Sequence, residues 1–502
     1  MNIDPHIIKT SQSHPLQIAE LVAPVGGGRI GITFCPGKRQ HSAMSGAWDR
    51  NLGVDLDRIR DWGAAVVVTL VEPHELDALS VASMGLEVQR RHMAWRHLPI
   101  RDVDIPDARF EKRWRCTGAE LRNRLRQGFN ILIHCKGGIG RAGTIAAKLL
   151  VEMGMLPTDA IVAVRAVRPG AIETRAQEKY VETQRPVGCT IPDKRAEAIW
   201  DRGVGALVGL AIGDAIGTTL EFAPRDSYPP LAEMVGGGPF ALEPGQWTDD
   251  TAMALALADS LLHAGTIDEG DLMRRFTDWR DNGVYSCTGD CFDIGLTTSA
   301  ALERWRRTGN PVAGSTAPSA AGNGSLMRLA PVALRYWNNR TKLVETAERQ
   351  SAATHAAPAA VSACSIFAQM LADAIEGSPL SSIFDAAVTR ADRLSDPAIS
   401  KVAMGSWRGR HRREIRGSGY VVESLEAALW SVARSGSFAE AVLTAANLGE
   451  DADTTAAIAG QLAGSIYGLS GIPDAWTRKL AWRDRIFAAG HSLMAAASAE
   501  SS

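Results

Sequence analysis

The chain has 502 residues, of which 45% are hydrophobic and 22% charged, which is ordinary for globular proteins and allows roughly two to four domains. Its 54 basic and 56 acidic side chains leave a net charge of −2, so overall charge favours neither a nucleic-acid nor a membrane partner, and we expect neither. Seven cysteines without regular spacing and an N-terminus without signal-peptide features predict reduced thiols and a cytoplasmic location.

Strands and helices alternate in the first part of the chain. Runs of apolar, often β-branched residues predict strands at 28–37, 64–71, 93–100 and 129–135. Helical spacing ended by glycine predicts helices at 55–63 and 116–128. This alternation is typical of an α/β layer with a mainly parallel sheet.

A glycine-rich loop connects the strand at 129–135 to a predicted helix. Its residues are Cys135, Lys136, Gly137, Gly138, Ile139, Gly140 and Arg141. Backbone N–H groups of such a loop, together with the helix N-terminus, form a cradle for an anion, and Arg141 adds a bidentate donor to phosphate oxygens. The positive field favours the thiolate of Cys135, a nucleophile for phosphoryl transfer. A structural cysteine before a glycine turn is the simpler alternative, but the strand–loop–helix context and the preceding His134 favour the phosphate site.

With this His-Cys-x5-Arg signature, residues 30–185 resemble the cysteine-dependent dual-specificity phosphatases, and among them the kinase-associated branch that acts on cyclin-dependent kinases. The resemblance implies that Cys135 attacks phosphorus and that Arg141 and the loop bind the phosphate. It also implies an acid that protonates the leaving oxygen, for which Asp102 occupies the family's position, with Asp104 and Asp107 as nearby substitutes. No cofactor is implied for this domain.

Two further positions bear on this resemblance. Gln177 lies in a segment similar to the one that packs beneath the loop and helps to place water. Many members have Ser or Thr after the arginine to help expel the thiolate, whereas this chain has Ala142, with Thr144 two positions later. We therefore expect slow turnover of the phosphoenzyme, and a phosphate-binding module with little catalysis stays open as an alternative.

The pattern changes near residue 196, after which nearly every strong segment is helical. We predict helices at 195–215, 250–264, 271–283, 356–377, 423–436 and 438–449. Residues 454–473 are uncharged and as long as a membrane span, but their small residues and Gln461 favour a tightly packed interior helix. With two prolines in 184–193, these patterns predict an α/β domain at 1–188, a linker at 189–197, an all-α domain at 198–495 and a tail at 496–502.

Two of the predicted helices begin with clustered threonines and aspartates. The residues are Thr248, Asp249 and Asp250 at one start and Asp451, Asp453 and Thr454 at the other. Helix capping is the simpler explanation, but it needs only one such residue for each helix. If the two starts face each other, four carboxylates converge, which requires cations. Hard oxygen ligands of this kind select Mg²⁺, Mn²⁺ or Ca²⁺ and suit a two-metal site.

These motifs, together with 213–222, resemble the ADP-ribosylglycohydrolase family over about residues 198–490. The founding bacterial member of that family removes ADP-ribose from dinitrogenase reductase. The resemblance implies an all-α fold with two Mg²⁺ or Mn²⁺ ions held by the six clustered residues. It further implies that Glu221 is the mobile catalytic glutamate and that Asp214 orders its segment. Segments 321–331 and 354–358 resemble those that line the ADP-ribose cleft, with the candidates Asn323, Gly324, Ser325, Met327 and His355.

The sequence thus predicts a bifunctional cytoplasmic enzyme. One domain would remove ADP-ribose from a modified protein or small molecule with the help of metal ions, and the other would hydrolyse phosphate monoesters on a protein or small molecule. A first alternative is an ADP-ribosyl hydrolase whose N-terminal domain is a phosphate-binding adaptor. A second is a helical domain that binds ADP-ribose without cleaving it. The cleaved linkage stays open between arginine, serine, an O-acetyl ester and a nucleic-acid end.

Overall fold

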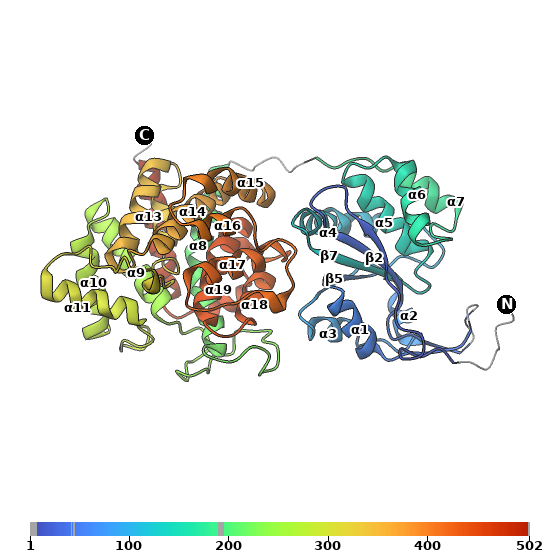
Figure 1. Cartoon of the computed structure of the whole chain (residues 1–502), viewed down its shortest axis with the longest axis horizontal. Coiled ribbons are helices and arrows are strands. Elements are labelled where there is room, and N and C mark those ends of the chain that lie inside the picture. Colours follow the sequence, from blue (N-terminus) through green and yellow to red (C-terminus); the bar gives the residue numbers. More distant parts are fainter. Residues whose placement is uncertain (1–7, 42, 44–45, 189–194, 500–502) are drawn as a thin grey trace. The chain divides into compact units, whose positions relative to one another are not determined.

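The computed structural model describes residues 8–41, 43, 46–188 and 195–499, which form two compact units (Figure 1). The first unit consists of the described residues up to 188 together with 408–411, and the second consists of 195–407 and 412–499. Residues 189–194 of the predicted linker and 500–502 of the predicted tail lie outside the described residues. The second unit begins with a helix at Ala196, two residues before the predicted boundary.

The first unit contains a five-stranded sheet in the order β1-β2-β7-β5-β6. The strands are β1 (Ala19–Val22), β2 (Arg29–Phe34), β5 (Ala64–Thr69), β6 (Ala94–His97) and β7 (Asn130–Cys135). All neighbours are parallel except β1 and β2, which confirms the predicted, mainly parallel sheet. The short pair β3 (Arg39–Gln40) and β4 (Trp48–Asp49) stands apart from it.

Helices cover both faces of this sheet (Figure 1). On one face lie α4 (Ala108–Arg126), α5 (Gly140–Glu152), α6 (Pro157–Val167) and α7 (Arg175–Glu182). On the other lie α1 (Leu52–Asp61), α2 (Pro73–Ala78) and α3 (Met84–Gln89). Successive β7 residues alternate between the two cores, with Ile131 and Ile133 on the first face and Leu132 on the second.

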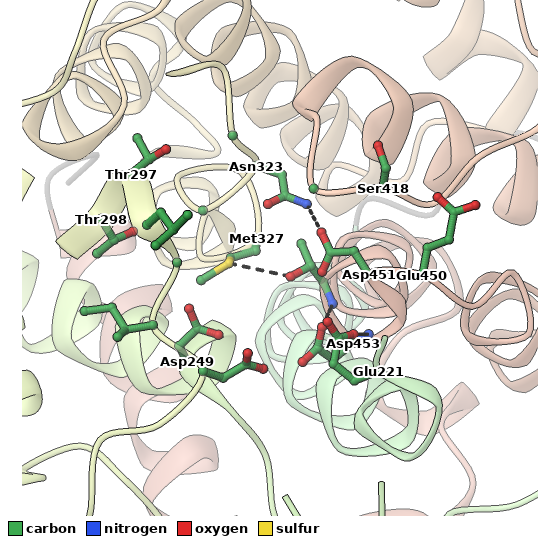
Figure 2. A pocket seen from close by; sticks show the side chains of 18 of the residues that line it. Glu221, Asp249, Thr297, Thr298, Asn323, Met327, Ser418, Glu450, Asp451 and Asp453 are labelled. Carbon is green, nitrogen blue, oxygen red and sulfur yellow. Dashed lines mark hydrogen bonds between the residues drawn. The ribbon is translucent and has the colours of Figure 1, made fainter. Parts of the chain in front are cut away.

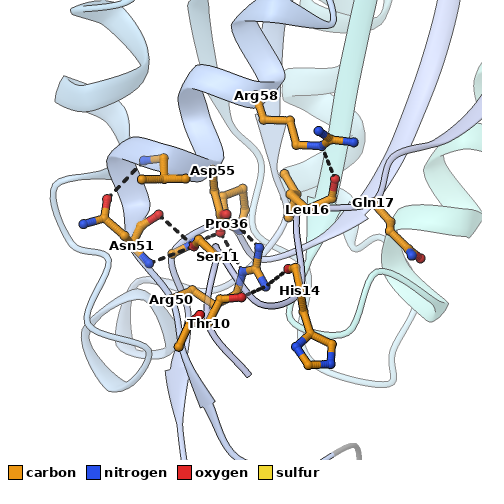
Figure 3. A network of polar contacts seen from close by, with 12 residues as sticks. Thr10, Ser11, His14, Leu16, Gln17, Pro36, Arg50, Asn51, Asp55 and Arg58 are labelled. Atoms are coloured by element: carbon orange, nitrogen blue, oxygen red, sulfur yellow. Dashed lines mark hydrogen bonds and ion pairs between the residues drawn. The ribbon is translucent and has the colours of Figure 1, made fainter. Parts of the chain in front are cut away.

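A buried ion pair joins the N-terminal segment to the start of α1 (Figure 3). Arg50 donates from Nε and Nη2 to Asp55, each at 2.8 Å, and from Nη1 to the carbonyl of His14 at 2.7 Å. Asp55 also accepts the N–H of Gly37 at 2.8 Å. This network holds the loop after β2, whose Cys35 N–H bonds the carbonyl of Lys136 at 3.4 Å. Removing one partner would strand a buried charge, at a cost of about 3–5 kcal/mol.

The second unit is helical throughout its regular elements. Its α-helices are α8 (Ala196–Gly217), α9 (Asp249–Ala264), α10 (Glu269–Asn282), α11 (Leu296–Thr308), α12 (Ala330–Tyr336), α13 (Arg340–Thr354), α14 (Pro358–Ile375), α15 (Leu380–Arg390), α16 (Pro397–Ala403), α17 (Val421–Ala433), α18 (Phe438–Ala446), α19 (Ala452–Tyr467), α20 (Asp474–Lys479) and α21 (Arg483–Ala499). The predicted all-α class is therefore confirmed.

Helices α8 and α19 pack with their backbones almost in contact. A Cβ added at Gly213 would lie 2.2 Å from the carbonyl oxygen of Ala456, and one at Gly460 would lie 2.1 Å from that of Gly209. Only glycine fits such an approach, and it places the end of α8 beside the start of α19. Residues 454–467 of the uncharged run thus belong to an interior helix, as predicted, whereas 468–473 lie beyond its end.

Within the described residues, two helical segments are long and apolar enough to cross a membrane by length and composition. They are Ala196–Leu220 and Pro358–Ile375, and 94% and 83% of their apolar windows are buried within the protein. Core helices of globular proteins have these properties as well.

Candidate active sites

Cys135 ends β7, and its sulfur accepts the N–H of Gly138 at 3.2 Å. Gly138 has φ +67°, and an added Cβ would lie 2.4 Å from the carbonyl carbon of Thr33, so a glycine is required there. A backbone N–H directed at the sulfur stabilises a thiolate more than a thiol. The loop therefore has the local geometry of a nucleophile at an anion site.

Arg141 lies in the first turn of α5 and is buried. Its two Nη atoms donate to the Glu75 carboxylate at 2.6 and 3.0 Å, and Nη1 also donates to the carbonyl of Ile100 at 2.9 Å. Burial opposes ionisation of Glu75, but the bonds from Arg141 hold its pKa below the usual value. Nη2 of Arg141 also pairs with Asp102 at 2.8 Å. The guanidinium is therefore fixed on one side by a buried carboxylate.

The three aspartates of the upstream loop have different partners. Asp102 pairs with Arg141, whereas Asp104 accepts the N–H of Ile105 at 2.8 Å. Asp107 accepts the N–H of Phe110 at 2.8 Å and so caps α4, which begins eight residues earlier than predicted. Of the three, the structure brings Asp102 to the cysteine loop.

Gln177 on α7 is fully buried beside the loop. Its side chain accepts the N–H of Glu173 at 3.1 Å and donates to the carbonyl of Asp104 at 3.2 Å. A Cβ at Gly140 would lie 3.0 Å from Gln177 Nε2 and 2.0 Å from Glu173 Oε1, so both side chains reach the loop. Burial, and then the charge of Asp102, raise the pKa of Glu173. Sequence analysis missed Glu173, because one acidic residue in an irregular segment has no distinguishing pattern.

Neither Ala142 nor Thr144, which follow Arg141, offers a free hydroxyl. Ala142 has none, and the Thr144 hydroxyl donates to the carbonyl of Gly140 at 2.8 Å within its own helix. In this arrangement Thr144 does not replace the missing hydroxyl at position 142.

In the second unit, the starts of α9 and α19 are capped by carboxylates from another segment. Asp214 on α8 accepts the N–H groups of Thr248 and Thr251, each at 2.9 Å, and both of their hydroxyls. Glu221 accepts the N–H groups of Ala452 at 2.7 Å and Asp453 at 3.3 Å. Capping thus does not account for the aspartates at these helix starts, whose side chains face each other instead.

The two helix starts meet in one acidic cluster. The Thr248 hydroxyl lies 3.2 Å from Asp453 Oδ2 and 3.4 Å from Asp250 Oδ2, and the Thr454 hydroxyl lies 3.3 Å from Asp250 Oδ2. Oxygens of Asp214, Asp250 and Asp453 lie within 4.8 Å of one another, as do those of Glu221, Asp451 and Asp453. Asn323 orients Asp451 with a hydrogen bond of 2.6 Å.

Burial and mutual repulsion perturb every carboxylate of this cluster. Burial first, and then neighbouring aspartates, raise the pKa of Asp214, Asp451 and Asp453 to about 7 each. The same causes raise the pKa values of Glu221, Asp249 and Asp250. Neutralisation by protons or by cations therefore stabilises the cluster.

A cavity of about 710 Å³ opens onto this cluster (Figure 2). Glu221, Asp249, Asp451, Asp453 and Thr454 line its acidic side. Four of the five predicted ADP-ribose residues line the same cavity, namely Asn323, Gly324, Met327 and His355. Ser325 does not line the cavity, because its hydroxyl faces inward and bonds Ser351 at 2.8 Å. Thr248 and Asp250 lie buried beneath the floor.

Asp293 lines the same cavity and was not predicted. It lies in an irregular segment between α10 and α11, with φ +59°. Burial and nearby aspartates raise its pKa to about 6. Its sequence neighbourhood also contains the exposed Asp290, and no spacing distinguishes the two, so folding alone identifies Asp293.

The cluster fits divalent cations by its donor chemistry. Its oxygens are hard carboxylate and hydroxyl ligands, and Asp250 Oδ1 is buried without a hydrogen-bond partner in the part of the chain described. The six predicted ligands are brought together by α9 and α19, and a cation would both satisfy this oxygen and offset the repulsion.

Comparison with known proteins finds a hydrolase family model for one region in each part of the chain. The ADP-ribosylglycohydrolase model matches residues 195–502, which is more than half of the chain. The model described as "Swiss Army Knife protein, DSP-PTPase phosphatase domain" matches residues 49–181. The predicted fusion of the two domains is thereby confirmed.

Individual relatives agree with this assignment. The ADP-ribosylarginine hydrolase Tri1 of Pseudomonas putida is 44% identical over 323 residues, covering 64% of this chain and 84% of its own length. The cyclin-dependent kinase inhibitor 3 of Rattus norvegicus is 32% identical over 139 residues, covering 27% of this chain and 64% of its own. The solved structure of an ADP-ribosylglycohydrolase-related protein complex is 40% identical with a TM-score of 0.54, covering 60% of this chain and 99% of that one.

Proposed function

The chain belongs to the ADP-ribosylglycohydrolase family, and we propose that its helical domain hydrolyses the bond between ADP-ribose and an arginine side chain. The observation that carries this proposal is the acidic cavity, since Glu221 and Asp293, which are not among the proposed metal ligands, line the space that a cationic guanidinium would enter. The 44% identity to an ADP-ribosylarginine hydrolase supports the same linkage.

We assign two divalent cations, Mg²⁺ or Mn²⁺, to the six residues at the starts of α9 and α19. They are Thr248, Asp249, Asp250, Asp451, Asp453 and Thr454. Bound cations would polarise ribose hydroxyls and lower the pKa of a water. The chain's own contribution is orientation, because Asp214 fixes Thr248 and Asn323 fixes Asp451.

Glu221 is the candidate for proton transfer in this reaction. Glycosidic cleavage passes through an oxocarbenium-like state, and the departing guanidine and the attacking water both exchange protons. Burial, together with Asp453 and Asp451, raises the pKa of Glu221, which suits a group that holds and releases a proton. Asp293, on the same cavity wall, is a second carboxyl available for this role.

The first domain is proposed to hydrolyse phosphate monoesters of proteins or small molecules. The Cys135 sulfur attacks phosphorus as the ester P–O bond breaks. The bound phosphate takes the place of Asp102 on the Arg141 guanidinium, and Asp102, protonated in this complex, gives its proton to the leaving oxygen. Water aligned by Gln177 then cleaves the phosphocysteine. The bond from Gly138 to the sulfur supports this chemistry, whereas the missing hydroxyl at Ala142 favours the rival adaptor role with little turnover.

The direct test is incubation of the protein with ADP-ribosyl-arginine, ADP-ribosyl-serine and O-acetyl-ADP-ribose, with and without Mg²⁺. We expect free ADP-ribose from the arginine conjugate only when Mg²⁺ is present. Release from serine or the ester alone would overturn the proposed linkage, and equal release in EDTA would overturn the metal requirement. A cytoplasmic location, proposed from the reduced-cysteine composition, is checked by fractionation of the native host.

A further inference from the structure

A chain of three buried side chains leads from the interior of the helical domain to the cavity. Arg328 donates from Nη2 to the Thr354 hydroxyl at 2.8 Å, and that hydroxyl lies 2.8 Å from Nδ1 of His355. All three residues are at most 2% exposed. Arg328 is itself held by Gln350, whose side-chain and main-chain oxygens it contacts at 3.0 and 2.9 Å.

The chemistry of the three groups decides where the protons lie. A guanidinium has only donors, so the Thr354 oxygen accepts from Arg328. The Thr354 hydroxyl proton is then free to point at Nδ1 of His355, which must be an acceptor. In a neutral imidazole the ring proton therefore lies on Nε2.

The opposite arrangement leaves an unsatisfied group. If Nδ1 carried the proton, Thr354 would accept two hydrogen bonds, and its own hydroxyl proton would have no acceptor among the described residues. Such a buried unpaired donor is costly. A doubly protonated imidazole is disfavoured as well, because burial and the charge of Arg328 lower the pKa of His355 to about 3.

The other edge of the His355 ring faces the cavity. His355 lines it, and a Cβ added at Gly324 would lie 3.1 Å from Nε2, while one at Gly322 would lie 3.3 Å from it. The two glycines therefore leave the space in front of Nε2 open. No described side chain forms a hydrogen bond with Nε2.

We propose that Arg328 and Thr354 are positioning residues that fix His355 as the neutral Nε2–H tautomer, so that it donates a hydrogen bond to an acceptor atom of the bound ADP-ribosyl group. This inference rests on the proposed function for the identity of the ligand. Neither Arg328 nor Thr354 lines the cavity, so both act through His355.

The test compares Thr354→Val, which removes the hydroxyl at similar volume, with Thr354→Ser, which keeps it. In full-length protein with ¹⁵N-labelled histidine rings, NMR identifies the protonated nitrogen of His355, assigned by loss of its signal in His355→Asn. We expect Nε2–H in the wild type and in Thr354→Ser, and a mixture of tautomers in Thr354→Val. Calorimetric titration with ADP-ribose in Mg²⁺ should show affinity about tenfold weaker for Thr354→Val, and within about twofold of wild type for Thr354→Ser.

An Nδ1–H signal in the wild type would overturn the proposal even if Thr354→Val failed to fold. Equal loss of affinity in Thr354→Ser and Thr354→Val would also overturn it, since a hydroxyl relay requires rescue by serine. These results can be distinguished from a failure of the proposed arginine linkage. If that linkage is wrong, ADP-ribosyl-arginine is not hydrolysed, while the tautomer signals stay as expected.

Discussion

The Thr248 hydroxyl oxygen lies 3.2 Å from Oδ2 of Asp453, a residue 205 positions later in the chain. This contact joins the first turns of α9 and α19, and it forms because glycines let α8 and α19 approach closely. Asp214 and Glu221 cap the two helices, so the aspartates at the helix starts remain available as ligands.

Replacement of Asp214 tests whether this residue caps α9 and does not bind a metal ion. Asp214→Asn keeps one acceptor oxygen but loses the charge that receives four donors, so we expect unfolding to become easier by about 0.5–2 kcal/mol, with or without Mg²⁺. Thermal melts in EDTA and in Mg²⁺ measure this, with Asp290→Asn on an exposed loop as control. A loss confined to Mg²⁺ would instead make Asp214 a metal ligand.

Much of this architecture follows from the sequence, because local patterns coincide with buried elements. The strands β5 and β7 are mostly apolar runs, buried at every residue except Asn130, and the threonine–aspartate pairs mark the starts of α9 and α19. Strand β1 escaped prediction because only Leu21 among its four residues is buried. Asp214 and Glu221 cap helices that lie elsewhere in the sequence, and Asp293 reaches the cavity only when distant segments come together. A local sequence pattern cannot predict such contacts.

Substitution of the nucleophile separates the two activities. Cys135→Ser should abolish hydrolysis of p-nitrophenyl phosphate, because an alkoxide does not form at neutral pH, and should leave ADP-ribose release near the wild-type rate. Both activities are measured on the same preparation, with Cys116→Ser at an exposed thiol as control. Parallel loss of both in a folded variant would show that the two sites are coupled.

A hydroxyl at position 142, next to Arg141, tests whether its absence slows breakdown of the phosphoenzyme. Ala142→Ser should accelerate breakdown of the phosphocysteine, because a serine proton stabilises the leaving thiolate. Rapid-quench measurements should show a burst of p-nitrophenol in the wild type and a faster steady state, by roughly tenfold, in the variant. Ala142→Gly provides the control, since it changes the side chain without adding a donor. A steady state equal in both variants would contradict this role.

The buried, neutral His355 predicts loss of stability in acid. Its pKa is lowered to about 3 by burial and Arg328, whereas an unfolded histidine titrates near 6.5. Below pH 6.5 the unfolded state binds a proton that the folded state does not, so stability falls as pH drops from about 6.5 to 3. Between pH 6.5 and 5 the contribution is about 1.6 kcal/mol. Denaturant melts of His355→Gln should show a correspondingly weaker pH dependence than wild type, and parallel curves would argue against a neutral histidine.

The last prediction concerns cations at Asp250, whose Oδ1 is buried without a partner in the described structure. In EDTA, Asp250→Asn should be as stable as wild type or more stable, because it removes one charge from a repelling cluster. In saturating Mg²⁺ the wild type should gain stability by mass action, about 2.7 kcal/mol at a metal concentration 100 times the Kd, and the variant should gain less and lose ADP-ribose release. Asp484→Asn, an exposed residue of α21, should match wild type in both conditions. Helix capping predicts instead an equal loss with and without metal, so thermal melts of the three proteins in both buffers decide between a ligand and a cap.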